Sequence, residues 1–157
     1  MIKISVCDDD EGQLTFFKQC FMEYNEKHKE KIEANFYQSV QSLLNEKKFS
    51  PDVYFLDIEL QDGNGLKLAG KIRTRNSKIP IVFITSHEEF MPEAFQVHAY
   101  QYLNEKKNAQ AVENVLNQLA DYFSEQNQIF SFQTYGEMIS WIAGILSALH
   151  RKNARIL

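Results

Sequence analysis

Short apolar runs alternate with amphipathic stretches along most of this chain, and no other feature constrains the fold as strongly. The runs Ile2–Val6, Val53–Leu56 and Ile81–Ile84 each have the length of a strand, and the first two are followed by acidic residues. Between the runs, apolar residues recur at spacings of three and four, which is typical of helices with one buried face. Near-continuous apolar strands separated by such helices predict a parallel sheet that is covered on both faces.

Five strand–helix pairs follow one another along the chain. Because crossovers between parallel strands are right-handed, these pairs predict an α/β fold with a doubly wound five-stranded parallel sheet, (βα)5. A turn is expected at Asp62–Gly65. In such sheets, sites form beyond the carboxyl ends of the strands. The expected strands cover residues 2–6, 31–37, 53–56, 81–84 and 100–103, and the expected helices cover residues 11–27, 40–44, 66–72, 88–95 and 112–123.

The end of the chain has a different pattern. Residues 128–134 alternate between polar and apolar side chains as a strand does, a turn is expected next, and residues 138–142 predict a returning strand. Residues 145–150 fit either a strand or a helix. Two parts are therefore expected, namely a domain over residues 1–122 and a short β-prone extension over residues 123–157.

Length and composition exclude several classes of protein. The chain has 157 residues and a formal net charge of −4, which suits one globular domain without general affinity for nucleic acid. No apolar run is long enough to span a bilayer, and Met1–Val6 lacks the features of a signal peptide. Cys7 and Cys20 suit neither a disulfide framework nor a zinc site. We expect a cytoplasmic protein with no membrane segment.

Two strand ends deliver three carboxylates, those of Asp8, Asp9 and Asp57. Like charges at close range are unstable unless a cation joins them or protons are taken up, and Mg2+ prefers oxygen ligands of this kind. Asp9 and Asp57 would hold the metal. A presented carboxylate can also attack phosphorus, so Asp57 is the candidate for an aspartyl phosphate, with Thr85 donating a hydrogen bond to the phosphoryl group.

A simpler interpretation of the acids stays open. Acidic and amide side chains at strand ends often cap helices or lie in solvated loops, and Asp10 and Asn64 both suit a cap. A pair of aspartates alone is weak evidence for a site. The combination of Asp8-Asp9, Asp57 and Thr85 after three different strands favours a functional cluster.

These residues resemble the receiver domain of two-component response regulators, a flavodoxin-like fold, over residues 1 to about 122. The opening Cys-Asp-Asp, the central Leu-Asp-Ile-Glu-Leu and the Thr-Ser-His string most resemble the LytTR class, in which the receiver controls a β-rich DNA-binding domain. The strings that carry the resemblance are Val6–Asp10, Phe55–Leu60 with Gly63 and Gly65, Phe83–His87 and Ala99–Leu103.

The resemblance implies that Asp57 is the phospho-acceptor and that a sensor histidine kinase donates the phosphoryl group. It also implies a Mg2+ site formed by Asp9, Asp57 and the backbone carbonyl of Glu59, with Asp8 acting mainly through a bridging water.

The resemblance further implies a switch pair. Thr85 would be the switch hydroxyl, which moves toward the new anion, and Tyr102 would be the aromatic that fills the vacated space. Tyr102 equally suits a packed core aromatic, and that alternative remains open.

The sequence departs from the family in the loop after the last expected strand. The family places a lysine, usually followed by proline, two residues after Leu103, whereas this chain has Glu105 there and no proline. A fourth negative charge beside a phosphate is unfavourable. Either the loop shifts so that Lys106 contacts the phosphate, or the cation is missing.

The final residues resemble the opening strands of a LytTR DNA-binding domain, of which only a small part is present. We therefore doubt DNA binding. A few strands alone bury too little surface to be stable. Arg151, Lys152 and Arg155 could contact phosphate, although a solvated basic terminus is the simpler interpretation.

These observations predict a phosphorylated switch rather than a metabolic enzyme. Self-phosphorylation and slow autodephosphorylation are the expected reactions, and phosphorylation is expected to promote homodimerisation and control of transcription. The alternatives are a relay receiver without DNA output and, less well supported, a Mg2+-dependent phosphohydrolase with Asp57 as nucleophile and Glu59 as general acid. An FMN-binding module is disfavoured because acids, rather than a phosphate-binding loop, follow the first strand.

Overall fold

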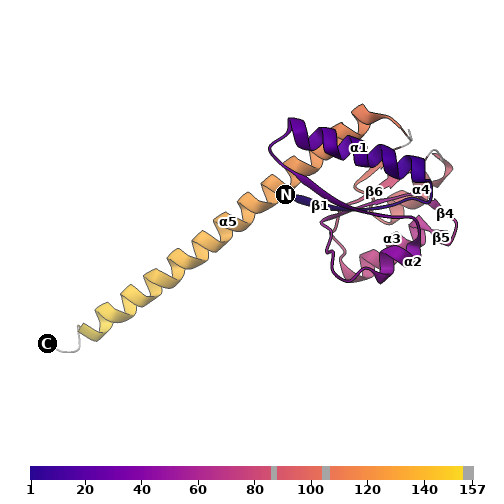
Figure 1. The fold of residues 1–157 in the computed structure, drawn as a ribbon. Coiled ribbons are helices and arrows are strands. Elements are labelled where there is room, and N and C mark those ends of the chain that lie inside the picture. The colour runs from indigo at the N-terminus through magenta and orange to yellow at the C-terminus, as the bar shows by residue number, and fades with distance from the viewer. Residues whose placement is uncertain (86–87, 104–106, 154–157) are drawn as a thin grey trace. The chain divides into compact units, whose positions relative to one another are not determined.

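The computed structural model describes residues 1–85, 88–103 and 107–153. A five-stranded parallel sheet in the order β2-β1-β3-β6-β7 forms its centre, which confirms the predicted doubly wound fold (Figure 1). The strands of this sheet are β1 (Ile2–Cys7), β2 (Ile32–Tyr37), β3 (Val53–Leu56), β6 (Ile81–Ile84) and β7 (Gln101–Leu103).

Helices cover both faces of the sheet, with α1 on one face and α2 and α3 on the other (Figure 1). Asp10 caps α1 by accepting hydrogen bonds from the backbone N–H groups of Gly12 and Gln13, and Asn64 caps α3 in the same way. The cap interpretation is therefore confirmed for both residues. The helices are α1 (Glu11–Lys27), α2 (Val40–Asn45), α3 (Gly65–Arg75), the 3-10 turn η1 (Glu88–Phe90), α4 (Met91–Gln96) and α5 (Ala109–Asn153).

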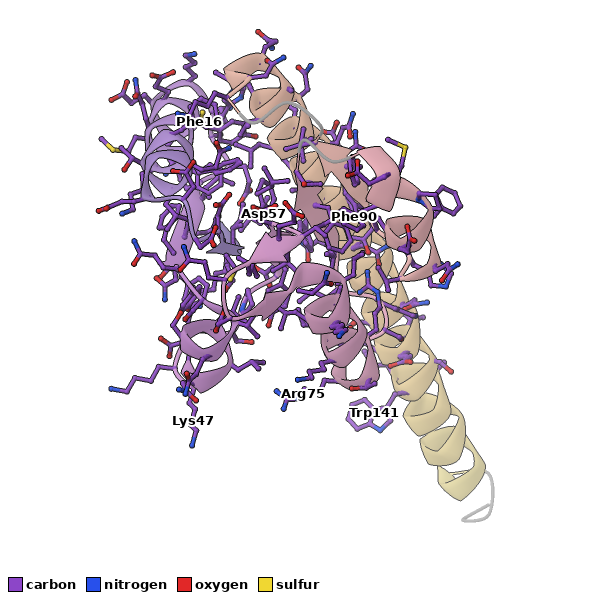
Figure 2. The ribbon with its side chains drawn as sticks, turned by 90° about the vertical axis from the view of Figure 1, so that its right-hand side faces the viewer. Phe16, Lys47, Asp57, Arg75, Phe90 and Trp141 are labelled. Carbon is purple, nitrogen blue, oxygen red and sulfur yellow. The ribbon has the colours of Figure 1, made fainter. Side chains whose placement is uncertain are left out.

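Alternate residues of β3 point into two different cores. Phe55 packs edge-on against Phe17 and Phe21 of α1, with both pairs of ring centroids 5.9 Å apart. Leu56 belongs to the apolar cluster on the opposite face of the sheet. A slip of one residue in the register of β3 would move both side chains to the wrong face of the sheet and disrupt the packing of both cores. Figure 2 shows Asp57 inside the fold, while the side chains of Lys47 and Arg75 project outward.

A two-stranded hairpin that the sequence did not predict follows β3. It consists of β4 (Glu59–Leu60) and β5 (Gly63–Asn64), which pair in antiparallel fashion. The predicted turn at residues 62–65 therefore contains the second strand of this hairpin and the first residue of α3.

The expected β-prone extension is wrong. Residues 109–153 form one continuous helix, α5, so the strands predicted at 128–134 and 138–142 and the turn between them do not exist. The likeness of this segment to the opening strands of a LytTR domain finds no support in the fold. A strand needs partners for its backbone groups, whereas a helix satisfies them internally, and no proline after Pro92 interrupts it.

The chain divides into two compact units, residues 1–117 and 118–157. The first unit contains the sheet and all the predicted site residues. Among the described residues, no helix combines the length and the apolar character that crossing a bilayer requires.

Gly65 generates the first prediction, because the backbone passes very close to it. Its N–H donates to the Ile58 carbonyl at 2.9 Å, and a Cβ at this position would lie 2.0 Å from the carbonyl oxygen of Asp57. Gly65→Ala should therefore lower the free energy of unfolding by about 3 kcal/mol through overpacking. Urea unfolding measures this change.

Gly70→Ala in the same helix is the matched control. A Cβ there meets no atom within 4 Å. This substitution should stabilise the protein by about 0.5–1 kcal/mol, as alanine does in a helix interior. Equal effects at the two positions would contradict the proposed role of Gly65.

Candidate functional site

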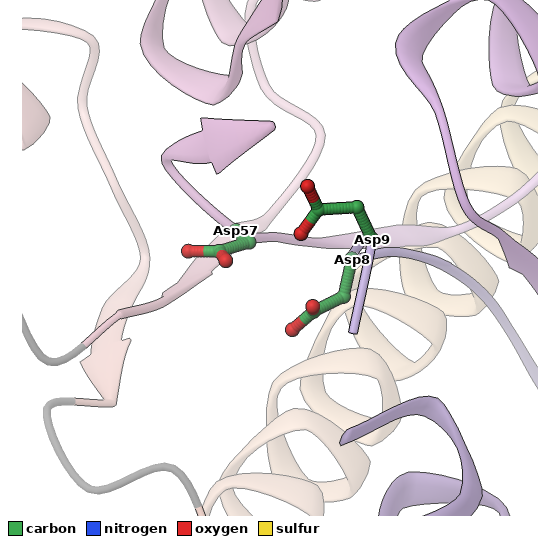
Figure 3. Close-up of side chains that lie close together, drawn as sticks. All are labelled: Asp8, Asp9 and Asp57. Atoms are coloured by element: carbon green, nitrogen blue, oxygen red, sulfur yellow. The ribbon is translucent and has the colours of Figure 1, made fainter. Parts of the chain in front are cut away.

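Three carboxylates meet at the carboxyl ends of β1 and β3. Asp8 and Asp9 follow β1 and Asp57 follows β3, and the pairing of Cys7 with Leu56 brings these two strand ends side by side. One oxygen from each carboxylate lies within 4.8 Å of the others (Figure 3). Asp8 and Asp57 are buried, and Asp9 is partly exposed. The predicted cluster of these three residues is therefore confirmed as a structural feature.

Backbone donors hold each of the three carboxylates. The N–H of Ile58 donates to Oδ1 of Asp57 at 2.7 Å, and the N–H of Asp10 donates to Oδ1 of Asp8 at 2.9 Å. Oδ2 of Asp9 accepts from the N–H of Gln61 at 3.0 Å. Such hydrogen bonds fix the direction of each side chain.

The buried thiol of Cys7 lies close enough to these carboxylates for their charges to affect its pKa. Burial, together with the negative charges of Asp62, Asp8 and Asp57, raises the pKa of Cys7 to about 12. The thiol is therefore neutral at physiological pH and is no nucleophile. Its environment also shows that negative charge is concentrated at this end of the sheet.

The hairpin after β3 is anchored by contacts that sequence reasoning missed. Asp62 accepts hydrogen bonds from the N–H groups of Val40 and Gln41, at 2.9 and 3.0 Å, and these bonds lower the pKa of Asp62. It thereby caps α2, a helix that begins more than twenty residues earlier in the chain. Together with the bond from Gln61 to Asp9, this cap fixes the loop that carries Asp57 into the hairpin.

Thr85 is fully buried at the end of β6, the strand next to β3. Its N–H donates to the carbonyl of Leu103 at 3.1 Å, which joins the ends of β6 and β7. Tyr102 lies in β7 opposite Phe83, is partly buried, and packs against the apolar cluster. This packing agrees with the interpretation of Tyr102 as a core aromatic and leaves its switch role as a prediction.

Of the remaining predicted site residues, the structure describes Glu59 but not Glu105 or Lys106. Glu59 begins β4 and its side chain is exposed, so the role expected there belongs to its backbone carbonyl. Glu105 and Lys106 lie outside the described residues, and so do Ser86 and His87. The proposed loop shift therefore remains a prediction.

The donor set of the cluster fits a Mg2+ ion. Three carboxylates with oxygens this close offer hard ligands for a small divalent cation, and a cation would offset their mutual repulsion. No other group of three or more histidine, cysteine or acidic residues within the described part of the chain is close enough to hold a metal.

Comparison with known proteins identifies the family to which this chain is similar. Residues 4–122 match the family model described as the response regulator receiver domain. An uncharacterized response regulatory protein of Yersinia pestis is 29% identical over 120 residues, which cover 76% of this chain and 49% of that protein. A sensory transduction protein LytR of Staphylococcus haemolyticus is 32% identical over 95 residues, which cover 60% of this chain and 36% of that protein. The chain thus spans half or less of the length of these relatives.

The fold has close structural neighbours. The response regulator protein TrrA of Thermotoga maritima, solved in complex with Mg2+-BeF, is 22% identical and has a TM-score of 0.65. The match covers 76% of this chain and 99% of that chain. At this identity the likeness establishes the fold alone.

The crowding of carboxylates generates a prediction for stability. Asp57→Asn removes one charge from the cluster while keeping an oxygen that can accept from Ile58, so in EDTA it should raise the free energy of unfolding. The gain should be about 1–2 kcal/mol, which lies within the range for two like charges about 4 Å apart near a protein surface. Urea unfolding with and without Mg2+ measures it, and Mg2+ should stabilise the wild type more than the variant.

Glu33→Gln serves as the control for a simple change in net charge. Glu33 is exposed on β2, away from the cluster. If both variants changed the stability equally, the carboxylates would not be repelling one another.

Proposed function

Because this chain belongs to the response regulator receiver family, we propose that Asp57 accepts a phosphoryl group from a sensor histidine kinase in a Mg2+-dependent reaction. The observation that carries the proposal is the gathering of Asp8, Asp9 and Asp57 at adjacent strand ends. A kinase of this kind acts on cytoplasmic partners, so the cytoplasm is the proposed location.

The transfer step needs an oriented carboxylate. An oxygen of Asp57 attacks the phosphorus of a phosphohistidine, an O–P bond forms, and the P–N bond breaks with its electrons going to the imidazole. The bond from Ile58 to Oδ1 sets the direction of the carboxylate, and burial limits the approach of competing water.

A bound Mg2+ would supply positive charge that offsets the charge on the phosphoryl oxygens. Asp9, Asp57 and the carbonyl of Glu59 would hold it directly, and Asp8 would do so mainly through water. The Thermotoga maritima protein that shares this fold was solved in complex with Mg2+-BeF, so a receiver-like fold can accommodate a divalent ion.

The proposed output is a shift between two conformations. Thr85 lies beside the acceptor strand, and its hydroxyl would donate to the new phosphoryl group. The space that it leaves would admit Tyr102 from β7, which changes the surface near α4, β7 and the start of α5. We further propose that this change promotes contact between two receivers, and that the receiver is of the LytR type because LytR proteins are among its relatives.

Phosphoryl labelling tests the proposal directly. Intact mass measured after incubation with acetyl phosphate and Mg2+ should show one added phosphoryl group, and EDTA or Asp57→Ala should abolish it. Glu59→Gln is the matched control, since only the backbone of Glu59 is assigned a role, and it should label as the wild type does.

Lys106→Ala should label more slowly if Lys106 provides the cation. Labelling of Asp57→Ala would refute the assignment, and rapid turnover of phosphate monoesters would instead favour a phosphohydrolase.

A second prediction separates phosphorylation from switching. Thr85→Ala should still be labelled at Asp57, because the acceptor and the metal-binding acids are intact. Hydrogen–deuterium exchange of β7 should change on phosphorylation of the wild type and change several-fold less in the variant. Val82→Ala, a buried substitution in the same strand without a hydroxyl, controls for loss of packing. An unaltered response of Thr85→Ala would remove Thr85 from the switch.

A further inference from the structure

The second half of α5 has an apolar repeat that the receiver function does not use. Between residues 132 and 149, apolar residues recur at alternating intervals of three and four, which is the spacing of a seven-residue repeat. A helix places such positions along one side. We call this set the α5 seam. Its positions are Phe132, Tyr135, Ile139, Ile142, Leu146 and Leu149.

Described side chains of the seam are open to solvent. Ile139 is 50% exposed and Ile142 is 44% exposed, and the neighbouring Met138 is 49% exposed. Within the described residues of the unit 118–157, α5 is the only element. A lone helix cannot bury its own apolar side, so this unit needs a partner to do so.

The pattern itself specifies the kind of partner. A 3.5-residue period is the signature of helices that pack side by side in a coiled coil, because it keeps the same side facing the partner over successive turns. No Asp, Glu, Lys or Arg occurs between Met138 and Leu149, so nothing in this stretch selects a charged surface. An uncharged seam is complementary to itself, which suits an isologous contact between identical chains.

The side of the helix opposite the seam carries polar residues. Gln133, Glu137 and Ser140 are exposed and lie outside the seam. Trp141 also lies outside it, is 69% exposed, and projects outward from α5 (Figure 2). The seam positions thus lie opposite polar residues, while Met138 and Trp141 widen the apolar side of the helix.

We propose that the α5 seam packs against the same segment of a second copy of this chain, and that this contact does not depend on phosphorylation of Asp57. The coil tethers two receivers and raises the effective concentration of each for the other. Phosphorylation then alters how two tethered receivers meet, rather than bringing two separate chains together.

Sedimentation velocity of the full chain over a concentration series tests the seam. The wild type and Asp57→Asn should both be dimeric, because the contact is independent of the acceptor. Ile142→Glu places a charge in the seam and should weaken dimerisation at least tenfold. Ser140→Glu places the same charge outside the seam and should leave the dimer intact. Monomeric wild type, or equal weakening by both glutamates, would overturn the proposal.

Two further measurements keep the result interpretable. The urea unfolding midpoint of Ile142→Glu should match that of Ser140→Glu, which shows that the receiver unit still folds. Trp141, the only tryptophan, reports on the alternative partner, a lipid surface. Vesicles of phosphatidylglycerol and phosphatidylethanolamine should leave its emission unchanged, because the second chain already covers the apolar side. A blue shift with co-sedimentation of monomeric protein would assign the apolar side to lipid and overturn the proposal.

The experiments can refute the proposed dimer contact and the proposed phosphorylation independently of one another. Loss of labelling at Asp57 with a persistent dimer would remove the proposed function and keep the seam. Normal labelling of a monomeric wild type would do the opposite.

Discussion

Repulsion among Asp8, Asp9 and Asp57 is the constraint on which the rest of the structure depends. Three carboxylates approach within 4.8 Å only because two strands buried on both faces are locked in register and end at the same edge of the sheet. Side chains such as Phe55 and Leu56 anchor β3 in two cores, and this anchoring opposes the tendency of the acids to separate. The same charge concentration makes the cluster receptive to a divalent cation and, in the proposed function, to a phosphoryl group that the cation neutralises.

The loop that carries Asp57 is held from three directions. Gly65 lets the start of α3 lie against the backbone of Asp57, Gln61 donates to Asp9, and Asp62 caps α2. A displacement at Asp57 is therefore coupled mechanically to a neighbouring acid and to two helices. On the other side of the acceptor strand, the backbone N–H of Thr85 donates to Leu103, so the proposed switch hydroxyl is joined to the strand that carries Tyr102.

The two units of the chain serve different physical purposes in our proposals. The receiver unit buries its apolar residues around the sheet, and its proposed reaction takes place at the cluster of Asp8, Asp9 and Asp57. Within the described residues of the second unit, the chain forms the helix α5, whose apolar seam needs a partner. Joining such a helix to a receiver would keep two acceptor sites near one another, so that weak contacts between receivers become sufficient for a response.

The sequence by itself determined the elements whose cause is local. Apolar runs placed the five strands, the three-and-four spacing placed α1 and α3, and the side chains of Asp10 and Asn64 marked two helix starts. It also identified the acids of the site, because parallel strands end at one edge and their terminal residues must meet there. These inferences succeed because hydrophobic periodicity and capping act within a few residues.

Only the tertiary structure decided the contacts between distant segments. The cap that Asp62 provides to α2 and the bond from Gln61 to Asp9 depend on loops that meet in space, and no local pattern encodes them. The end of the chain also shows that a local sequence pattern does not decide the structure. Residues 128–142 alternate well enough to suggest strands, but a strand is stable only beside another strand, whereas a helix closes its own hydrogen bonds, and the chain forms α5.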